Sequence, residues 1–390
     1  MKIKMHIGFI TPEYPHNKVK HAAGIGTSVK NLVDALLKKG VKATVFVYSQ
    51  KQSEVFNDNG VEIHLIKQQK YSLLGWYFHR KYIQKYINKI ILKNKIDLVE
   101  SPDWTGITAF MKFNIPLLIR LHGTDTYFCY LENRKLKKKN YFFEKKALKN
   151  AFSFISPTDF TAKLTAQLFN INLNKIKTIY HGINLEKFKN DEVSNFNKHS
   201  VLYIGSVIRK KGVLELAKIF NLLVEKEAKA SLTVIGSDVF DVKTGNESTI
   251  SLMKELMSSK AISKTIFLGK IPYADIQNYI KKSHVCVFPS FAETFGMVTV
   301  EAMAMSKVVV NSNIGWSKEL IKNEENGYLI HPKSTAEYVV KISELFNNIE
   351  LSLQIASNAQ LSVYKKFNIY KQVDENIKYY QKIINDYSLS

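Results

Sequence analysis

Short apolar runs alternate with segments of helical periodicity along the first half of the chain. The apolar runs predict strands at residues 4–10, 43–48, 97–99, 117–121 and 152–156. Between the first two runs, residues 29–36 carry one apolar helical face, with Thr27 as the expected cap of this helix and Gly40 as its end. Strands that alternate with helices predict a parallel sheet flanked by helices.

The same alternation restarts after residue 200. Strands are predicted at residues 201–205, 232–236, 265–268, 284–288 and 308–311, with a helix from Val213. Residues 189–198 carry no sustained apolar period and are predicted to be a linker, whereas residues 372–387 have the spacing of a helix. The sequence therefore predicts two α/β domains, with ligands bound in a cleft at the carboxyl ends of the strands.

Length and composition fit this prediction. A chain of 390 residues exceeds the usual size of one α/β domain, and an apolar fraction of 45% supplies two cores. Cys129 and Cys286 give no disulfide framework and no metal-ligand spacing, which fits a reducing cytoplasm. No run approaches twenty apolar residues, and the N-terminal stretch lacks a signal-peptide cleavage site, so we expect a cytoplasmic protein.

The net charge of +22 indicates an anionic partner, or else a lysine-rich bias of the source proteome. Residues 70–95 mix aromatic and basic side chains, and Ile83, Tyr86, Ile87 and Ile90 share a helical face. This pattern is typical of a helix lying on an anionic membrane, and also of a domain helix that buries its apolar face. Residues 134–149 form a second basic cluster. No nucleic-acid-binding module is recognisable, so no nucleic acid is expected as a partner.

The segment 288–304 carries the strongest local signal for chemistry. A strand ends at Phe288, and a helix is predicted to begin near Gly296. The free backbone amides of the first turn of this helix would hold a diphosphate. Glu293 precedes this helix and Glu301 lies inside it, with seven residues between them. Carboxylates accept hydrogen bonds from hydroxyl groups well, which suits the recognition of a sugar and a ribose. The alternative is one acidic residue favouring the helix dipole and one solvated glutamate.

Other candidate residues follow strands of the first half. Gly24 and Gly26 follow the first strand, but Val29 replaces the third glycine of a dinucleotide-binding fingerprint, so that function is excluded and a tight turn is the alternative. His122 follows a strand and either points into the cleft or bonds a backbone carbonyl. Asp125 either orients His122 or caps the next helix, and we favour the cap. Residues 100–104 either line an acceptor site or pack.

The segment 288–304 resembles the E-x7-E signature of glycosyltransferase family 4, which has the GT-B fold. Residues 24–27, 180–188 and 206–212 resemble the family's glycine-rich loop, its domain-junction segment and its phosphate-binding loop, and the terminal helix resembles the one that crosses back to the N-domain. The resemblance implies an α/β GT-B protein with two Rossmann-like domains whose parallel sheets face each other across a cleft. The domains would be residues 1–188 plus 370–390 and residues 199–369, with 189–198 as the linker.

The resemblance also assigns roles to matching residues. His122, Glu293 and Lys211 would be catalytic. The donor-binding set would be Gly24, Gly26, Ser206, Arg209, Lys211, Glu293, Thr294, Phe295, Gly296, Met297 and Glu301. Glu293 would bind donor-sugar hydroxyls, Glu301 the ribose, and Lys211 the diphosphate. The family often has an arginine where Ser206 stands, so either Arg209 replaces that guanidinium or Lys211 acts alone.

The implied function is a retaining glycosyltransferase that moves a hexosyl or related group from a nucleotide sugar to a glycan or lipid-linked saccharide. Polysaccharide or lipopolysaccharide biosynthesis would be its setting, and UDP or GDP the carrier nucleotide. No cofactor and no metal are expected, because the chain has no Asp-x-Asp and no His/Cys cluster. The inner face of the cytoplasmic membrane is a candidate location. A GT-B nucleotide-sugar epimerase and a non-catalytic glycan- or nucleotide-binding protein are the rival hypotheses.

Overall fold

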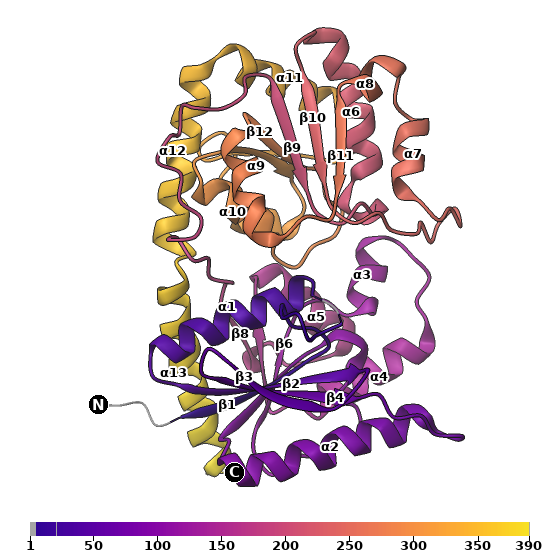
Figure 1. Ribbon diagram of the computed structural model, residues 1–390, viewed down its shortest axis with the longest axis vertical. Coiled ribbons are helices and arrows are strands. Elements are labelled where there is room, and N and C mark those ends of the chain that lie inside the picture. Colours follow the sequence, from indigo (N-terminus) through magenta and orange to yellow (C-terminus); the bar gives the residue numbers. More distant parts are fainter. Residues whose placement is uncertain (1–4, 21, 390) are drawn as a thin grey trace. The chain divides into compact units, whose positions relative to one another are not determined.

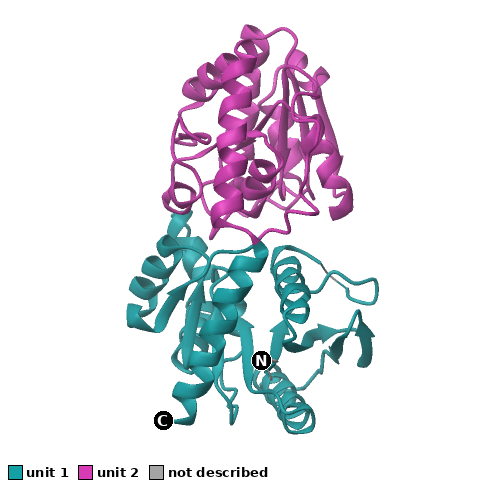
Figure 2. Ribbon diagram, turned by 90° about the vertical axis from the view of Figure 1, so that its left-hand side faces the viewer, with its two compact units in different colours: residues 1–182, 369–390 teal, residues 183–368 magenta. Residues whose placement is uncertain are grey.

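The structure, a computed structural model, describes residues 5–20 and 22–389, so Lys4 of the first predicted strand lies outside the described residues. The chain forms two compact units (Figures 1 and 2). Unit 1 comprises Met1–Gly182 and Ile369–Ser390, and unit 2 comprises Ile183–Asn368. Residues 189–198, predicted to be a linker, belong to unit 2, where the buried Asn190 side chain donates to the Met305 carbonyl at 3.1 Å.

Eight described strands form the sheet of unit 1, in the order β3-β4-β2-β1-β5-β6-β7-β8. The strands are β1 (His6–Thr11), β2 (Lys42–Gln50), β3 (Glu54–Asp58), β4 (Val61–Lys67), β5 (Leu98–Pro102), β6 (Leu117–Arg120), β7 (Ser153–Ser156) and β8 (Ile176–Thr178). All neighbours are parallel except β3 and β4, so the sheet has one antiparallel edge strand that the sequence pattern did not reveal. The five predicted strands correspond to β1, β2, β5, β6 and β7.

Helices cover both faces of this sheet (Figure 1). They are α1 (Gly24–Lys38), α2 (Gly75–Asn94), α3 (Asp125–Leu131), α4 (Lys138–Lys149), α5 (Asp159–Phe169) and α13 (Ile369–Ser388), with the short 3-10 helices η1 (Trp104–Gly106) and η2 (Leu173–Lys175). Apolar residues of α1 and α13 pack into one core, and those of α2 and α4 pack into the other. Helix α1 begins at Gly24 with Ala23 as its cap, so the prediction that Thr27 caps it is wrong.

A buried network attaches the C-terminal helix to unit 1. Arg120 on β6 binds Glu100 on β5 through two hydrogen bonds, at 2.7 and 2.9 Å. Arg120 also donates to Asn376 at 2.6 Å and to Tyr380 at 3.2 Å, both on α13. Removing one partner would leave a buried charge unpaired, which costs about 3–5 kcal/mol. The last residues of the chain therefore fold with its first half.

Helix α2 resolves the two interpretations of residues 70–95. Ile83, Ile87 and Ile90 are buried in the core of unit 1, and Tyr86 packs against them. This face is a packing face and is not available to a membrane. Lys85, Lys89 and Lys93 are exposed on the same helix. Within the described residues, no helix is long and apolar enough to cross a bilayer.

Unit 2 contains a parallel sheet of six described strands, in the order β11-β10-β9-β12-β13-β14. They are β9 (Ser200–Ile204), β10 (Ser231–Ile235), β11 (Thr265–Gly269), β12 (Val285–Phe288), β13 (Val308–Ser312) and β14 (Tyr328–Ile330). The helices are α6 (Val213–Lys226), α7 (Thr249–Glu255), α8 (Ser259–Ser263), α9 (Ile276–Lys282), α10 (Met297–Ala304), α11 (Thr335–Asn347) and α12 (Ile349–Lys366), with η3 (Arg209–Lys211), η4 (Tyr273–Asp275) and η5 (Gly315–Glu319). Because the strands are parallel, the loops that carry the predicted motifs emerge at one edge.

Candidate functional site

Two loops at the carboxyl edge of the unit 2 sheet are joined through their backbones. The Phe291 amide donates to the Lys210 carbonyl at 2.8 Å. Gly212 has φ +69, and a Cβ at this position would lie 1.8 Å from the Pro289 carbonyl oxygen. Only glycine tolerates both the left-handed backbone and this approach. The join places Lys211, after β9, against the loop that follows β12.

Lys211 and Glu293 form an ion pair across these loops. The Lys211 side chain is 22% exposed and that of Glu293 is 17% exposed, so both remain accessible at the sheet edge. An ammonium group neutralises phosphate charge, whereas a carboxylate accepts hydroxyl hydrogen bonds. The structure therefore brings together two of the three predicted catalytic residues, from positions that are 82 residues apart.

Glu301 lies inside α10, which begins at Met297 as the sequence pattern predicts. Gly296 forms its N-cap with φ +88, and the predicted donor-binding residues Thr294 and Phe295 precede this cap. The Glu301 side chain is 2% exposed, and the Tyr273 hydroxyl donates to it. Burial raises the pKa of Glu301 to about 7, although the hydrogen bond from Tyr273 opposes this shift. Tyr273 was not predicted, because its only signal is its place after β11 at the same edge.

The loop after β9 contains two further predicted donor-binding residues. Arg209 makes two hydrogen bonds to the buried Asp241, at 2.9 and 2.7 Å. These hydrogen bonds are the largest cause of the lowered Asp241 pKa, which falls to about 2. Ser206 is exposed, and its carbonyl accepts from the Tyr203 hydroxyl at 3.1 Å. Arg209 is thus paired with Asp241 as Lys211 is paired with Glu293, and the choice between the two cations for a diphosphate stays a prediction.

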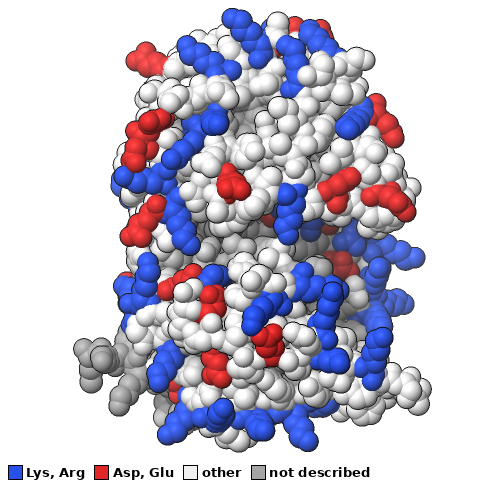
Figure 3. Space-filling model, in the orientation of Figure 1, with Lys and Arg blue, Asp and Glu red and all other residues white. Residues whose placement is uncertain are grey.

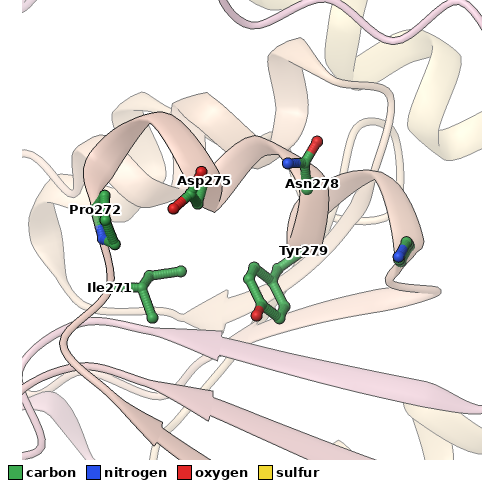
Figure 4. Close-up of a pocket in the computed structure, with 6 residues that line it drawn as sticks. Ile271, Pro272, Asp275, Asn278 and Tyr279 are labelled. Atoms are coloured by element: carbon green, nitrogen blue, oxygen red, sulfur yellow. The ribbon is translucent and has the colours of Figure 1, made fainter.

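A pocket of about 340 Å³ flanks the same edge of unit 2 (Figure 4). It is lined by Ile271, Pro272, Asp275, Asn278, Tyr279 and Lys282. Figure 4 shows Ile271 and Tyr279 below the helical segment that carries Asp275 and Asn278. None of its lining residues is among the predicted site residues, and Ile271 and Pro272 place the pocket directly after β11. Among the described residues, no group of three or more His, Cys, Asp or Glu could hold a metal ion.

In unit 1, His122 lies in a loop that a buried carboxylate holds in place. The carboxylate of Asp103, which is 1% exposed, accepts hydrogen bonds from the His122 amide at 2.8 Å and from the Gly123 amide at 3.2 Å. Burial raises the pKa of Asp103 to about 7, while these two hydrogen bonds lower it. Asp103 lies in the segment 100–104, for which the sequence allowed two roles, lining an acceptor site or packing. Its observed contacts position His122.

The His122 ring stacks on the ring of His181, with centroids 5.5 Å apart and planes 19° apart. His181 Nδ1 lies 3.2 Å from the Ser28 hydroxyl of α1. Burial lowers the pKa of His122 well below its usual value, and the neighbouring His181 and the Arg120 charge act in the same direction. Burial likewise lowers the pKa of His181 to about 3. Both imidazoles are therefore neutral at pH 7, and His181 is a neighbour that the sequence did not reveal.

The expected cap at Asp125 is wrong. Thr124 caps α3 by accepting the Tyr127 amide at 3.0 Å. Asp125 is the first helical residue and binds Arg134 at 3.0 Å and Asn140 at 2.8 Å. It orients the α3–α4 connection, so neither of its two predicted roles is observed.

Gly26 supports the turn that follows β1. Its amide donates to the Glu13 carboxylate at 2.8 Å, and a Cβ at Gly26 would lie 2.8 Å from the Glu13 carbonyl oxygen. The alternative interpretation of these glycines as a tight turn therefore describes Gly26 well. Gly24 is exposed, with open space where a side chain would begin.

Family models match both halves of the chain. The model described as Glycosyltransferase Family 4 matches residues 22–187, and the model described as Glycosyl transferases group 1 matches residues 185–362. An uncharacterised glycosyltransferase of Methanocaldococcus jannaschii is 25% identical, over 97% of this chain and 98% of its own. The N,N'-diacetylbacillosaminyl-diphospho-undecaprenol alpha-1,3-N-acetylgalactosaminyltransferase of Campylobacter jejuni is also 25% identical, over 91% and 95%.

Solved structures share the fold along nearly the whole chain. Sucrose-phosphate synthase from Thermosynechococcus elongatus aligns with a TM-score of 0.81 at 18% identity, covering 98% of this chain and 100% of that one. The Anabaena protein HepE, in complex with UDP-glucose, aligns with a TM-score of 0.72 at 18% identity, covering 96% and 99%. The predicted fold class, two Rossmann-like α/β halves, is confirmed.

Proposed function

The chain belongs to glycosyltransferase family 4 and has the GT-B fold, and from this premise we propose that it transfers a hexose or related sugar from a nucleotide sugar to a saccharide acceptor with retention of configuration. The observation that carries the proposal is the Lys211–Glu293 pair beside the N-terminus of α10. A cation, a helix N-terminus and a carboxylate supply what a sugar diphosphate needs: neutralisation of its charge and an acceptor for its hydroxyls.

In the proposed donor complex, Lys211 and the amides at the start of α10 hold the diphosphate. Glu293 accepts hydrogen bonds from hydroxyls of the donor sugar. Glu301 accepts hydrogen bonds from hydroxyls of the ribose, and Tyr273 fixes the orientation of the Glu301 carboxyl group. Because protein groups supply the positive field, we propose that transfer is independent of metal. Full loss of activity in EDTA, restored by Mn²⁺, would contradict this part of the proposal.

Retention follows from the proposed role of the leaving group. The bond between the anomeric carbon and the diphosphate oxygen breaks, the acceptor oxygen bonds to the same face of that carbon, and the acceptor proton passes to the departing diphosphate. No protein nucleophile is required, so the protein contributes positioning and charge stabilisation. A neutral His122 suits this step because it can donate to or accept from the sugar without adding charge. Assignment by NMR of a β-linkage made from an α-linked donor would refute retention.

The donor nucleotide is proposed to be UDP, with GDP as the alternative. Support for UDP comes from the likeness to HepE, whose structure holds UDP-glucose. A thermal-shift screen of nucleotide sugars tests the donor directly. A ligand at 100 times its Kd stabilises the folded state by about 2.7 kcal/mol.

We propose a lipid-linked saccharide as acceptor, in cell-surface polysaccharide or lipopolysaccharide synthesis on the inner face of the cytoplasmic membrane. The Campylobacter jejuni relative is named for an undecaprenol-diphosphate acceptor. Figure 3 shows Lys and Arg side chains gathered over unit 1, including the part formed by α2. Lys81 contacts the Phe110 carbonyl, which leaves Lys85, Lys89 and Lys93 as the exposed cations to test.

Replacing these three lysines by glutamate is expected to lower binding to vesicles of anionic lipid and to leave donor affinity unchanged. Binding by the unmodified protein is expected to weaken as salt shortens the Debye length from about 10 Å at 0.1 M to about 3 Å at 1 M. If the unmodified protein does not bind such vesicles at low salt, the membrane proposal fails and a soluble acceptor becomes the better hypothesis.

A donor-turnover assay separates this proposal from its rivals. A glycosyltransferase releases the nucleotide and forms a new glycosidic bond when acceptor is present. An epimerase would release a free sugar epimer without acceptor, and a binding protein would bind the nucleotide sugar without turnover.

A further inference from the structure

A second pocket, of about 540 Å³, lies at the carboxyl edge of the unit 1 sheet. It is bounded by the ends of β2 and β4, the first turns of α2, and Thr105 of η1. Its lining includes the cationic Lys70 and Arg80 together with His79, and none of its lining residues is acidic. The pocket therefore has a positive wall with no carboxylate of its own to neutralise it.

Arg80 is the central feature of this wall. Its Nη1 donates to the Trp76 carbonyl at 3.0 Å, its Nη2 donates to the Thr105 and Gly106 carbonyls at 3.5 Å, and its guanidinium lies 4.5 Å from the centre of the Phe143 ring. Among the described residues it forms no ion pair, and its buried Nε has no hydrogen-bond partner. Burial lowers the pKa of Arg80, as expected for a guanidinium without a counterion. A partly buried guanidinium that has backbone carbonyls but no carboxylate as partners is a binding group for an anion.

The backbone around the pocket is held in unfavourable conformations. Ser49 and Thr105, which line it, have φ +57 and φ +56, and Leu74 beside the lining residue Gly75 has φ +49. Left-handed conformations at residues other than glycine cost about 1–3 kcal/mol each and cluster at ligand sites.

The pocket shares its edge with the His122 loop. In the strand order, β2 and β6 are separated by β1 and β5, so three strand spacings, about 14 Å, lie between the pocket and His122. The segment between the lining residues Tyr71 and Gly75 exposes Leu73 and Leu74, which are 77% and 56% exposed. An anion in the pocket would thus lie beside an apolar tip and away from the reacting hydroxyl.

We propose that this pocket binds a phosphate or diphosphate group of the acceptor, remote from the hydroxyl that receives the sugar. The inference rests on the proposed function, because that function supplies the acceptor. Arg80 forms charge-assisted hydrogen bonds to the phosphate oxygens, Lys70 adds a second positive charge, and Trp76 forms an apolar part of the wall. Binding energy from this remote group positions the acceptor at His122.

Trp76 provides a reporter that requires no turnover. The unmodified protein is titrated with inorganic pyrophosphate in the presence of saturating UDP, which occupies the proposed donor site, and the spectrum of the Trp76→Phe variant is subtracted. We expect a saturable change in Trp76 fluorescence. Arg80→Gln is expected to weaken the interaction by about 10- to 100-fold, as for a lost hydrogen bond to a charged group. The exposed Lys163, on α5 and outside the pocket, provides the control Lys163→Gln, which should bind as the unmodified protein does.

A parallel titration with farnesyl diphosphate distinguishes the sources of the phosphate. Binding at least tenfold tighter than pyrophosphate assigns a lipid-linked diphosphate, and equal binding assigns a water-soluble phosphorylated acceptor; either supports the site. Two further variants keep the test valid if Arg80→Gln does not fold. Arg80→Lys keeps the charge, and Lys70→Gln changes only an exposed side chain. No saturable change at Trp76, or equal affinity in Arg80→Gln, Lys70→Gln and the unmodified protein, overturns the inference. Failure of donor turnover with intact Trp76 binding would instead count against the proposed function.

Discussion

Replacing Glu301 by glutamine tests the electrostatics of the candidate donor site. In the folded state the pKa of Glu301 is raised to about 7, from an ordinary value of 4.5, because the side chain is buried. The folded state therefore binds this proton more tightly than the unfolded state does. The free energy of unfolding falls as pH rises from about 4.5 to about 7 and loses no more above that range. A difference of about 2.5 pKa units corresponds to about 3 kcal/mol.

Glutamine keeps an acceptor oxygen for the Tyr273 hydroxyl and cannot ionise. The difference in unfolding free energy between Glu301→Gln and the unmodified protein is therefore expected to grow by about 3 kcal/mol in favour of the variant between pH 4.5 and pH 8. Any pH-independent free-energy cost of introducing the amide shifts the curve of this difference against pH as a whole and does not alter its pH dependence. Affinity for the nucleotide donor should fall at pH 8, since a neutral acceptor makes weaker hydrogen bonds than a carboxylate.

The assay is urea unfolding followed by tryptophan fluorescence at several pH values. The chain has three tryptophans, and only Trp316 lies in unit 2, where it is buried. A background with Trp76→Phe and Trp104→Phe makes Trp316 the reporter of unit 2. Glu255→Gln, at an exposed position of α7, is the matched control and should leave the pH dependence unchanged. Parallel curves for Glu301→Gln and its parent would refute the reasoning, because they would mean that Glu301 is ionised in the folded state throughout.

Four further substitutions test the geometry of the candidate site. Lys211→Met or Glu293→Gln should each reduce kcat/KM by about 10²-fold or more, and unmodified rates in a steady-state assay would show that the pair is not catalytic. Asp103→Asn should cost about 1–3 kcal/mol in urea unfolding and lower kcat, because one oxygen is lost as an acceptor for the amides that hold His122; unchanged kcat would separate this loop from catalysis. Gly212→Ala should destabilise unit 2 and weaken donor binding, since its Cβ would overlap the neighbouring loop, and a variant with unmodified melting temperature would contradict that contact.

The local pattern of the chain was sufficient to predict the fold class and the main motif. Apolar runs separated by helical periods determine strands and helices residue by residue, and a buried parallel strand needs only a continuous apolar run. The helix after Gly296 was predicted for the same reason, since a strand end, a glycine and an apolar helix occur within one short segment. Four of the described strands were not predicted. The edge strand β3 is half-exposed and has five residues, β8 and β14 have three residues each, and β4 interrupts its apolar residues with Glu62 and His64, so each leaves a weak signal.

Tertiary structure decided which residues meet. The Lys211–Glu293 pair, the Asp103 contacts to the His122 loop and the His181 stack all join segments that are far apart in sequence. Periodicity reports which face of an element is apolar. It does not report which strands become neighbours, and that order sets these contacts.

Helix α2 shows the same limit for function. An apolar stripe beside lysines gives the same sequence pattern whether it faces a bilayer or the core of its own domain. The pattern is the same because membrane binding and core packing both remove apolar area from water. Only packing showed that Ile83, Ile87 and Ile90 face the core, and that Leu73, Leu74 and Leu92 are left exposed in this region. The sequence by itself determined the elements and their chemistry, and the folded chain decided which of those groups are left facing a ligand.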